Sequence, residues 1–205
     1  MSIPKASLYT LVVLLSYGLA LILFRVRVKG REVIERSSGY ITVARHRSYW
    51  DIPLLAVALG WRNRIHFIAR KGLARNPLLL PFVRLFATVI DRSDFHPSDF
   101  KRMLKVMQRE RLIAIFPEGT TRMRVQARAG AIHFAKLTGK ALLPVNIRAA
   151  GPYPPQYPFR FPRVTISIGN PVFFSDLEGE SEEKQGRAAQ YRLMTERLME
   201  RVDTV

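Results

Sequence analysis

The chain has 205 residues, no cysteine, and 33 lysines and arginines against 16 acidic residues, so its formal net charge is +17. This length is typical of a single domain with its own core, and the lack of cysteine excludes disulfides, thiolate metal sites and an acyl-cysteine intermediate. The strongly positive charge favours polyanionic partners, namely nucleic acids, anionic lipid head groups or phosphorylated substrates.

The first predicted element is an uncharged apolar stretch over residues 8–24, which Lys5 precedes and these cations follow: Arg25, Arg27, Lys29 and Arg31. The stretch is near the shortest helix that can cross a hydrocarbon core of about 30 Å, so spanning the membrane and lying in its interface are both open. A cleaved signal peptide and a buried soluble helix are the alternatives, but no clear small-x-small cleavage site is present and the following charge resists translocation. We therefore expect residues 1–24 to be a retained anchor, and residues 25–205 to form one domain on the cytoplasmic face of the membrane.

After this stretch, short β-branched runs alternate with longer helical patterns. The runs predict strands over 41–44, 66–69, 88–90, 113–116, 142–147 and 164–168. The helical patterns predict helices over 52–59, 97–109, 126–137 and 181–202. This alternation indicates an α/β fold with a mixed, largely parallel sheet flanked by helices, whose strand ends carry the working loops. The proline-rich stretch 152–162 reads as a rigid connection inside this domain, because a strand pattern resumes directly after it.

His46 and Asp51 lie where the predicted strand 41–44 gives way to the predicted helix 52–59. On one helix, two residues five apart would lie about 140° from each other, so their side chains can meet only if His46 is in the turn and Asp51 is near the helix start. A carboxylate on one ring nitrogen would fix the tautomer and let the other nitrogen take a proton from an alcohol. Taken alone, however, the pair fits a helix N-cap beside a surface histidine better.

Further motifs follow this pair in order: Val89-Ile90-Asp91-Arg92, Phe116-Pro117-Glu118-Gly119-Thr120 and Leu143-Pro144-Val145. Together with His46 and Asp51, they resemble the glycerophospholipid acyltransferase family, of the lysophosphatidic acid (1-acylglycerol-3-phosphate) acyltransferase type. The segment 67–73, which includes Lys71, is similar to the stretch after the family's second strand, where a lysine is usual. The resemblance covers residues 43–145.

The resemblance implies a membrane-attached enzyme whose catalytic domain is residues 25–205. Such an enzyme moves a fatty acyl group from acyl-CoA or acyl carrier protein to the free hydroxyl of 1-acyl-sn-glycerol 3-phosphate, which gives phosphatidic acid. It needs no cofactor beyond the thioester co-substrate, and its partners are membrane phospholipids rather than nucleic acid. In this reading His46 is the general base, Asp51 holds His46, and no acyl-enzyme forms.

The resemblance also implies the residues that bind the acceptor: Lys71, Arg92, Glu118, Gly119 and Arg122. The planar guanidinium of Arg92 can bind a phosphate through two hydrogen bonds. Lys71 would add a point charge, Glu118 would help shape the acceptor site, and Gly119 suits a turn with positive φ. Apart from the resemblance, Arg92 reads as a solvated surface arginine, and Glu118-Gly119 as an ordinary turn after a strand.

The chain departs from the family pattern at several positions. Arg45 stands where the family often has Asn or Ser, Phe86 and Ala87 stand where it often has Gly, and Thr121 separates Arg122 from the motif that arginine usually follows directly. The phosphate contact from Arg122 is therefore open, and a different lyso-lipid, such as a lyso amino-acid lipid, is an alternative acceptor.

A second alternative is a non-enzymatic protein that binds an anionic surface, either membrane or nucleic acid, and in which the motifs are only structural. A metal site is not expected, because the remaining histidines lack ligand spacing with any acidic or histidine partner; they are His66, His96 and His133.

Overall fold

A computed structural model describes residues 5–72, 80–91, 94, 96–119, 126–156, 161–179 and 186–205. Its strands are β1 (Arg27–Lys29), β2 (Tyr40–Ala44), β3 (Ile65–Arg70), β4 (Ala87–Ile90), β5 (Leu112–Ile115), β6 (Ala141–Ala150) and β7 (Arg163–Ile168). Its α-helices are α1 (Lys5–Phe24), α2 (Asp51–Leu59), α3 (Leu80–Phe86), α4 (Pro97–Arg109), α5 (Gly130–Thr138) and α6 (Arg187–Thr204). Short 3₁₀ helices are η1 (Arg31–Val33) and η3 (Phe174–Leu177).

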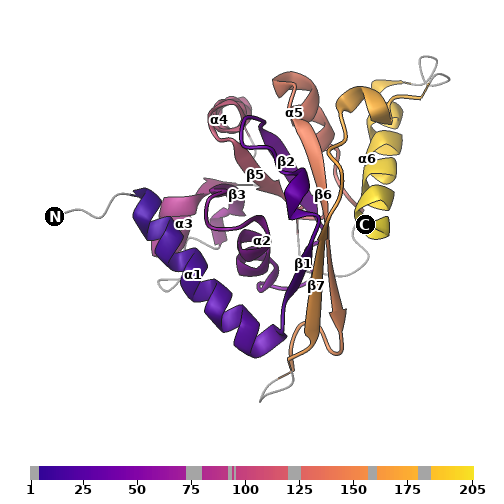
Figure 1. Cartoon of the computed structure of the whole chain (residues 1–205). Coiled ribbons are helices and arrows are strands. Elements are labelled where there is room, and N and C mark those ends of the chain that lie inside the picture. The colour runs from indigo at the N-terminus through magenta and orange to yellow at the C-terminus, as the bar shows by residue number, and fades with distance from the viewer. Residues whose placement is uncertain are drawn as a thin grey trace.

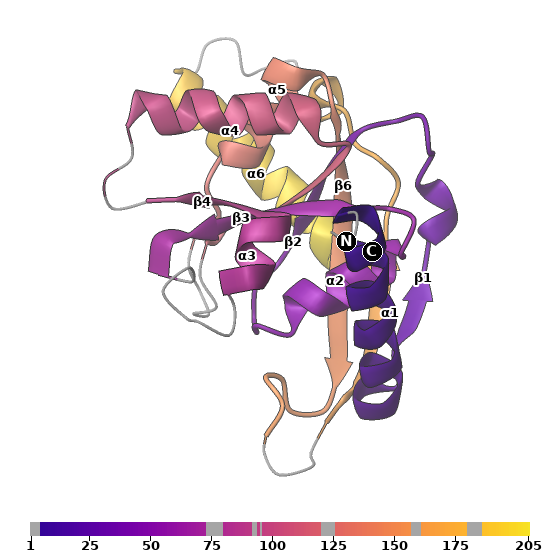
Figure 2. The same ribbon diagram turned by 90° about the vertical axis from the view of Figure 1, so that its left-hand side faces the viewer.

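The strands form one seven-stranded sheet in the order β1-β7-β6-β2-β5-β3-β4. Every neighbouring pair is parallel except β6 and β7, which are antiparallel. Helices α1, α2 and α3 cover one face of the sheet, and α4, α5 and α6 cover the other (Figures 1 and 2). The predicted α/β fold with a mixed, largely parallel sheet is therefore confirmed. Because the carboxyl ends of parallel strands share one edge, the loops after β2, β3, β4 and β5 all lie along that edge.

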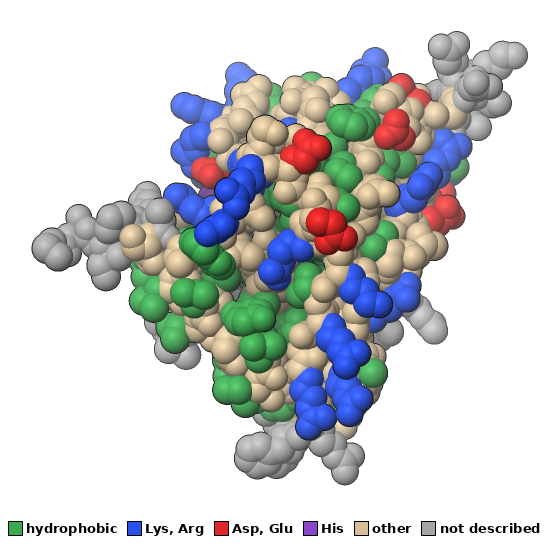
Figure 3. Space-filling model, viewed as in Figure 1, with side chains coloured by type: hydrophobic (Ala, Val, Ile, Leu, Met, Phe, Trp, Pro, Cys, Tyr) green, Lys and Arg blue, Asp and Glu red, His purple; other side chains and the backbone are tan. Residues whose placement is uncertain are grey.

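Helix α1 packs one of its faces against the domain. Tyr9, Val13, Ala20 and Phe24 are buried in the same core as α2, yet only 22% of the apolar window 7–24 is buried. The exposed apolar side chains are Leu11, Leu14, Leu15, Tyr17, Leu19, Leu21 and Ile22. These side chains form a hydrophobic surface over α1 (Figure 3). The helix is long and apolar enough to cross a membrane, but in this fold one side of it is part of the protein core.

The six predicted strands are all present, with small differences at their ends. The sequence analysis missed β1 and α3. Strand β1 is only three residues long and alternates exposed cations with one half-buried valine, so its hydrophobic pattern is too short to recognise. It is an edge strand, where exposed charges discourage pairing with other chains.

Two helices differ from their predicted bounds. Helix α5 begins at Gly130 rather than at residue 126, because the Arg128 amide donates a hydrogen bond to the Pro117 carbonyl (3.0 Å) and holds the preceding residues against the loop after β5. Helix α6 is described from Arg187 and runs to Thr204; residues 181–185 of the predicted helix lie outside the described residues. The described parts of the proline-rich stretch, residues 152–156 and 161–162, lie between β6 and β7, which pair in the same sheet.

Candidate active site

Asp51 is the first residue of α2 and folds back over the turn that follows the buried strand β2. Its Oδ2 accepts hydrogen bonds from the amides of Arg47 (2.6 Å) and Ser48 (2.8 Å) and lies 3.1 Å from Nδ1 of His46. The side chain of Asp51 is 1% exposed. The predicted geometry of this pair, with His46 in the turn and Asp51 at the helix start, is therefore confirmed.

The imidazole of His46 is fixed on two sides. Asp51 contacts Nδ1, and the ring of Phe116 stacks on the imidazole with centroids 4.4 Å apart and an angle of 21°. The side chain keeps 14% of its surface exposed. With Nδ1 bonded to the carboxylate, Nε2 is the nitrogen that can exchange a proton with a substrate. This arrangement suits a general base that acts on an alcohol.

Tyr153 is a further member of this group that the sequence analysis missed. It lies after β6, and its phenolic OH donates a hydrogen bond to Oδ1 of Asp51. Burial raises the pKa of the Tyr153 phenol, and the charge of Asp51 and this hydrogen bond raise the pKa further. The phenol therefore stays protonated, as a donor, at physiological pH. No local pattern marks this residue, because it is 102 residues from its partner and lies in a proline-rich stretch.

Glu118 and Gly119 form the turn after β5 and lie directly against the His46 turn. Gly119 has φ of 66°, and its amide donates to the Phe116 carbonyl (2.9 Å), so the turn needs the left-handed conformation that glycine adopts easily. Oε2 of Glu118 accepts from the His46 amide (3.2 Å), and Oε1 accepts from Arg45 (2.6 Å). The carboxylate thus joins the loop after β5 to the loop after β2.

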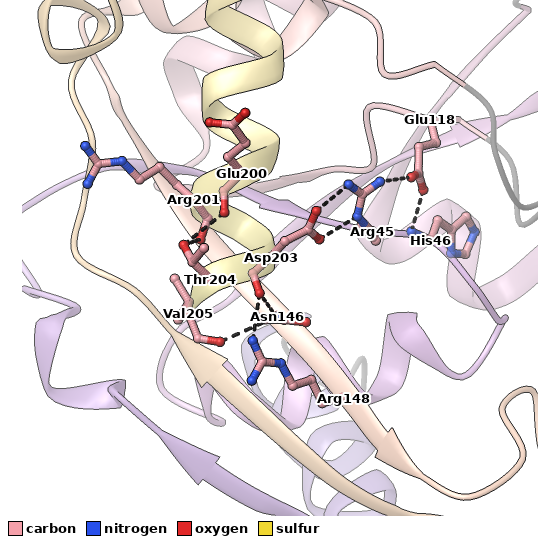
Figure 4. Close-up of polar contacts among 10 residues, drawn as sticks. All are labelled: Arg45, His46, Glu118, Asn146, Arg148, Glu200, Arg201, Asp203, Thr204 and Val205. Atoms are coloured by element: carbon pink, nitrogen blue, oxygen red, sulfur yellow. Dashed lines mark hydrogen bonds and ion pairs between the residues drawn. The ribbon is translucent and has the colours of Figure 1, made fainter.

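Arg45 extends this connection to helix α6, as Figure 4 shows. Its guanidinium donates two hydrogen bonds to Asp203, each 2.6 Å, and a third to Glu118. Hydrogen bonding to Arg45 lowers the pKa of Asp203, so the ion pair is complete at neutral pH. The backbone carbonyl of Asp203 in turn accepts from Asn146 (3.0 Å) and Arg148 (2.7 Å) on β6. Arg45, where the chain departs from the family pattern, therefore joins the loops after β2 and β5 to the last helix.

Lys71 and Asp91 follow the neighbouring parallel strands β3 and β4, on the same sheet edge as His46. Nζ of Lys71 lies 3.2 Å from Oδ2 of Asp91, and the lysine side chain is 63% exposed. The structure therefore gathers His46, Asp51, Glu118 and Gly119 at the ends of β2 and β5, with Lys71 further along the edge. The other two predicted acceptor-binding residues, Arg92 and Arg122, lie outside the described residues.

An apolar cavity of about 430 Å³ opens beside Phe116, between the sheet and the helices of the α4–α6 layer. Its lining includes Ile68, Ile90, Phe100, Met103, His133 and Tyr191. Since the ring of Phe116 also stacks on His46, one side chain separates this cavity from the imidazole. Among the described residues, no group of three or more histidine, aspartate or glutamate side chains could hold a metal ion.

Comparison with known proteins places this geometry in a family. The family model described as Acyltransferase matches residues 25–148. A 1-acyl-sn-glycerol-3-phosphate acyltransferase of Bacillus subtilis is 27% identical over 177 residues, which are 85% of this chain and 87% of that protein. A Streptococcus pneumoniae protein of the same name is 29% identical over 154 residues, which are 74% of this chain and 57% of that protein.

The fold is shared with a crystal structure of the 1-acyl-sn-glycerophosphate (LPA) acyltransferase PlsC from Thermotoga maritima. The TM-score is 0.68 at 20% identity, and the match covers 97% of this chain and 78% of that one. The family model spans more than half of the chain and includes the His46 turn, Asp51 and the Glu118-Gly119 turn, which the fold brings together at one edge of the sheet. The chain therefore belongs to the acyltransferase family.

Proposed function

We propose that this acyltransferase moves a fatty acyl group from an acyl thioester to the free hydroxyl of 1-acyl-sn-glycerol 3-phosphate, which gives phosphatidic acid. The observation that carries the proposal is the contact of Nδ1 of His46 with the buried carboxylate of Asp51 (3.1 Å), which leaves Nε2 for the substrate. The acceptor is supported by the two curated relatives, both of which are named 1-acyl-sn-glycerol-3-phosphate acyltransferases.

In the proposed reaction, Nε2 of His46 takes the hydroxyl proton as the acceptor oxygen attacks the thioester carbonyl. A carbon–oxygen bond forms and the carbon–sulfur bond breaks, and the proton on His46 passes to the departing thiolate of coenzyme A or acyl carrier protein. Asp51 stabilises the imidazolium that exists between these steps. The transfer is direct, in agreement with a chain that has no cysteine to carry the acyl group.

We further propose that the acceptor's phosphate binds on the β3–β4 side of the site, with Lys71, Arg92 and Arg122 as its cations. An exposed ion pair such as Lys71–Asp91 is worth only about 0 to 1 kcal/mol, so a phosphate can replace the carboxylate as the partner of the lysine. Glu118 and Gly119 would shape the acceptor site from the loop after β5. The apolar cavity beside Phe116 is the proposed place for an acyl chain, because it adjoins the imidazole.

Membrane attachment is proposed to occur through α1. One side of this helix is part of the core, through residues such as Val13 and Phe24, so the helix cannot span a bilayer without leaving the domain. We therefore favour an interfacial position, in which the exposed leucines contact the acyl chains and the domain stays on the cytoplasmic side.

The test is an acyl-transfer assay on the purified full chain in detergent micelles. Labelled acyl-CoA and acyl-acyl carrier protein are each offered with lysophosphatidic acid, other lysophospholipids and a phosphate-free lyso amino-acid lipid, and His46→Ala serves as the inactive control. We expect labelled phosphatidic acid from the wild type. If the enzyme prefers the phosphate-free acceptor, that lipid and not lysophosphatidic acid is the substrate. If no combination of donor and acceptor gives a product, the proposed activity is wrong.

A further inference from the structure

A basic groove lies on the outer part of the sheet, away from the His46–Asp51 pair. It is formed where β1, β7 and the second half of β6 pair with one another, and it encloses about 620 Å³. The charged residues that line it are Arg25, Arg27, Lys29, Arg148 and Arg163. Among the described residues of its lining there is no acidic side chain.

The strand register places the four groove cations that belong to strands on one face of the sheet. Arg27 pairs with Thr165, which also pairs with Arg148, and Lys29 pairs with Ser167. Since side chains two residues apart on a strand point to the same side, the cations share this face with two hydroxyl groups. Guanidinium, ammonium and hydroxyl groups together are the donors that bind phosphate oxygens in proteins.

Most of these cations have no anionic partner among the described residues. The side chains of Arg25, Arg27, Lys29 and Arg163 form no ion pair or hydrogen bond within the part of the chain that the structure describes. Like charges gathered in this way repel one another. The groove is thus complementary to an anion that comes from outside the domain.

The backbone at Arg25 supports the same reading. Arg25 directly follows α1 and has φ of 46°, and it is the one non-glycine residue with positive φ among the described residues. A side chain in the left-handed region costs about 1 kcal/mol or more. The strained residue is a cation of the groove, at the junction of α1 and β1.

The groove lies beside the exposed apolar face of α1. In Figure 3, lysine and arginine side chains gather at the lower end of the molecule, next to the hydrophobic side chains over α1. Ile22, near the end of that helix, is 79% exposed. An apolar surface bordered by unpaired cations matches the acyl region and head-group layer of a bilayer that contains anionic lipids.

We propose that this groove binds the phosphate-bearing head group of an anionic membrane phospholipid, while the exposed face of α1 contacts the adjacent acyl chains. The inference rests on the proposed membrane attachment and names the lipid class that it requires. Strand β6 reaches the groove beyond the end of β2, because Ala44 pairs with Val145 and β6 continues to Ala150. Docking there turns the sheet edge that carries His46 towards the bilayer that holds the lipid acceptor.

The test compares two variants of the full chain that remove equal charge. Arg27→Gln/Lys29→Gln changes the groove, and Lys101→Gln/Lys105→Gln changes two exposed lysines of α4, which contacts β4, at the opposite end of the strand order from β1. Binding to vesicles of phosphatidylcholine with phosphatidylglycerol is measured by sedimentation at low and raised salt. We expect the groove variant to bind about 30-fold more weakly, since each cation near an anionic surface is worth about fivefold, and the α4 variant to lose much less.

A second groove variant distinguishes the loss of a cation from a folding defect. Arg25→Gly removes a groove cation at a position whose φ suits glycine, so we expect weaker binding to anionic vesicles with an unchanged melting temperature. Equal losses in the groove and α4 variants would overturn the proposal in favour of general charge attraction. The proposal would also be overturned if the groove variant lost binding to a DNA oligonucleotide but kept its binding to vesicles. Vesicle binding is measured without turnover, so its outcome is separate from that of the acyl-transfer assay.

Discussion

The proposed proton-transfer side of the site and its proposed phosphate side are built in opposite ways. Asp51 is 1% exposed, and its oxygens meet the His46 ring, two backbone amides and the Tyr153 phenol. Lys71, in contrast, is 63% exposed and meets one carboxylate at 3.2 Å. A proton transfer needs fixed distances and angles, whereas a head group must enter and leave. Substitutions on the proton-transfer side are therefore expected to lower kcat, and substitutions on the phosphate side are expected to raise KM.

The loops of the proton-transfer side are also connected to a distant helix through Arg45. Arg45 holds Glu118 and Asp203 at once, so the loops after β2 and β5 are tied to each other and to helix α6 (Figure 4). Lys71, in contrast, contacts the carboxylate of Asp91 through an exposed ion pair. We therefore expect the loops around the imidazole to be held more firmly than the Lys71 side.

The largest effect is expected from His46→Ala, which removes the proposed base. We expect kcat to fall by about 10² to 10⁴-fold with little change in circular dichroism or melting temperature. The matched control is His66→Ala, because the His66 ring shares a hydrogen bond with Thr88 (2.8 Å) near the start of β3, away from the sheet edge that carries His46. That variant should lose stability and keep kcat. If a folded His46→Ala protein keeps wild-type turnover, His46 is not the base, and the site has no proton-transfer side of the proposed kind.

A smaller effect is expected from Tyr153→Phe, which deletes the donor to Oδ1 of Asp51. Hydrogen bonds to charged groups are worth about 1.5 to 3 kcal/mol, so a loss of about tenfold in kcat is expected. The other charged groups beside the His46 turn, Arg47 and Glu118, are unchanged. Without the phenol, the carboxylate attracts the imidazole proton more strongly, and the acid limb of the kcat/KM profile should move to higher pH.

Tyr9→Phe is the control for that change. The Tyr9 phenol donates to the Asn63 carbonyl (3.1 Å) and accepts from the Ile65 amide (3.2 Å), and burial raises the pKa of Tyr9 to about 12. This variant also loses a buried, protonated phenol, but far from the imidazole. It should lower the melting temperature without moving the acid limb. A purely structural role for Tyr153 is indicated if both variants lose stability and neither moves the limb.

The same comparison explains which features the sequence could predict. Strands such as 41–44 have local apolar patterns, and His46 and Asp51 are only five positions apart in the sequence, so both were predictable. Tyr153 and Asp203 were not, because they reach the site through tertiary packing from 102 and 158 residues away along the chain. Strand β1 was missed because its three residues carry mostly exposed cations, a pattern that loops share.

The smallest effect is expected from Lys71→Gln, which tests the proposed phosphate side. An exposed charge contact is worth about 1 kcal/mol at most, so the KM for lysophosphatidic acid should rise about fivefold, while kcat stays unchanged. This pattern is expected when a contact is equally strong in the ground state and the transition state. The KM for the thioester donor, measured in the same assay, should not change, since Lys71 is proposed to contact only the acceptor's phosphate.

The control for Lys71→Gln is Lys101→Gln, which changes an exposed lysine of α4 that is neither in the groove nor on the sheet edge that carries His46. Raised salt should reduce the difference between Lys71→Gln and the wild type, because exposed charges are screened over about 8 Å at physiological ionic strength. If Lys71→Gln instead lowers kcat and leaves KM alone, Lys71 acts in the transition state. The division of the site into a rigid proton-transfer side and an exposed binding side would then be wrong, since an exposed lysine would share in the chemistry.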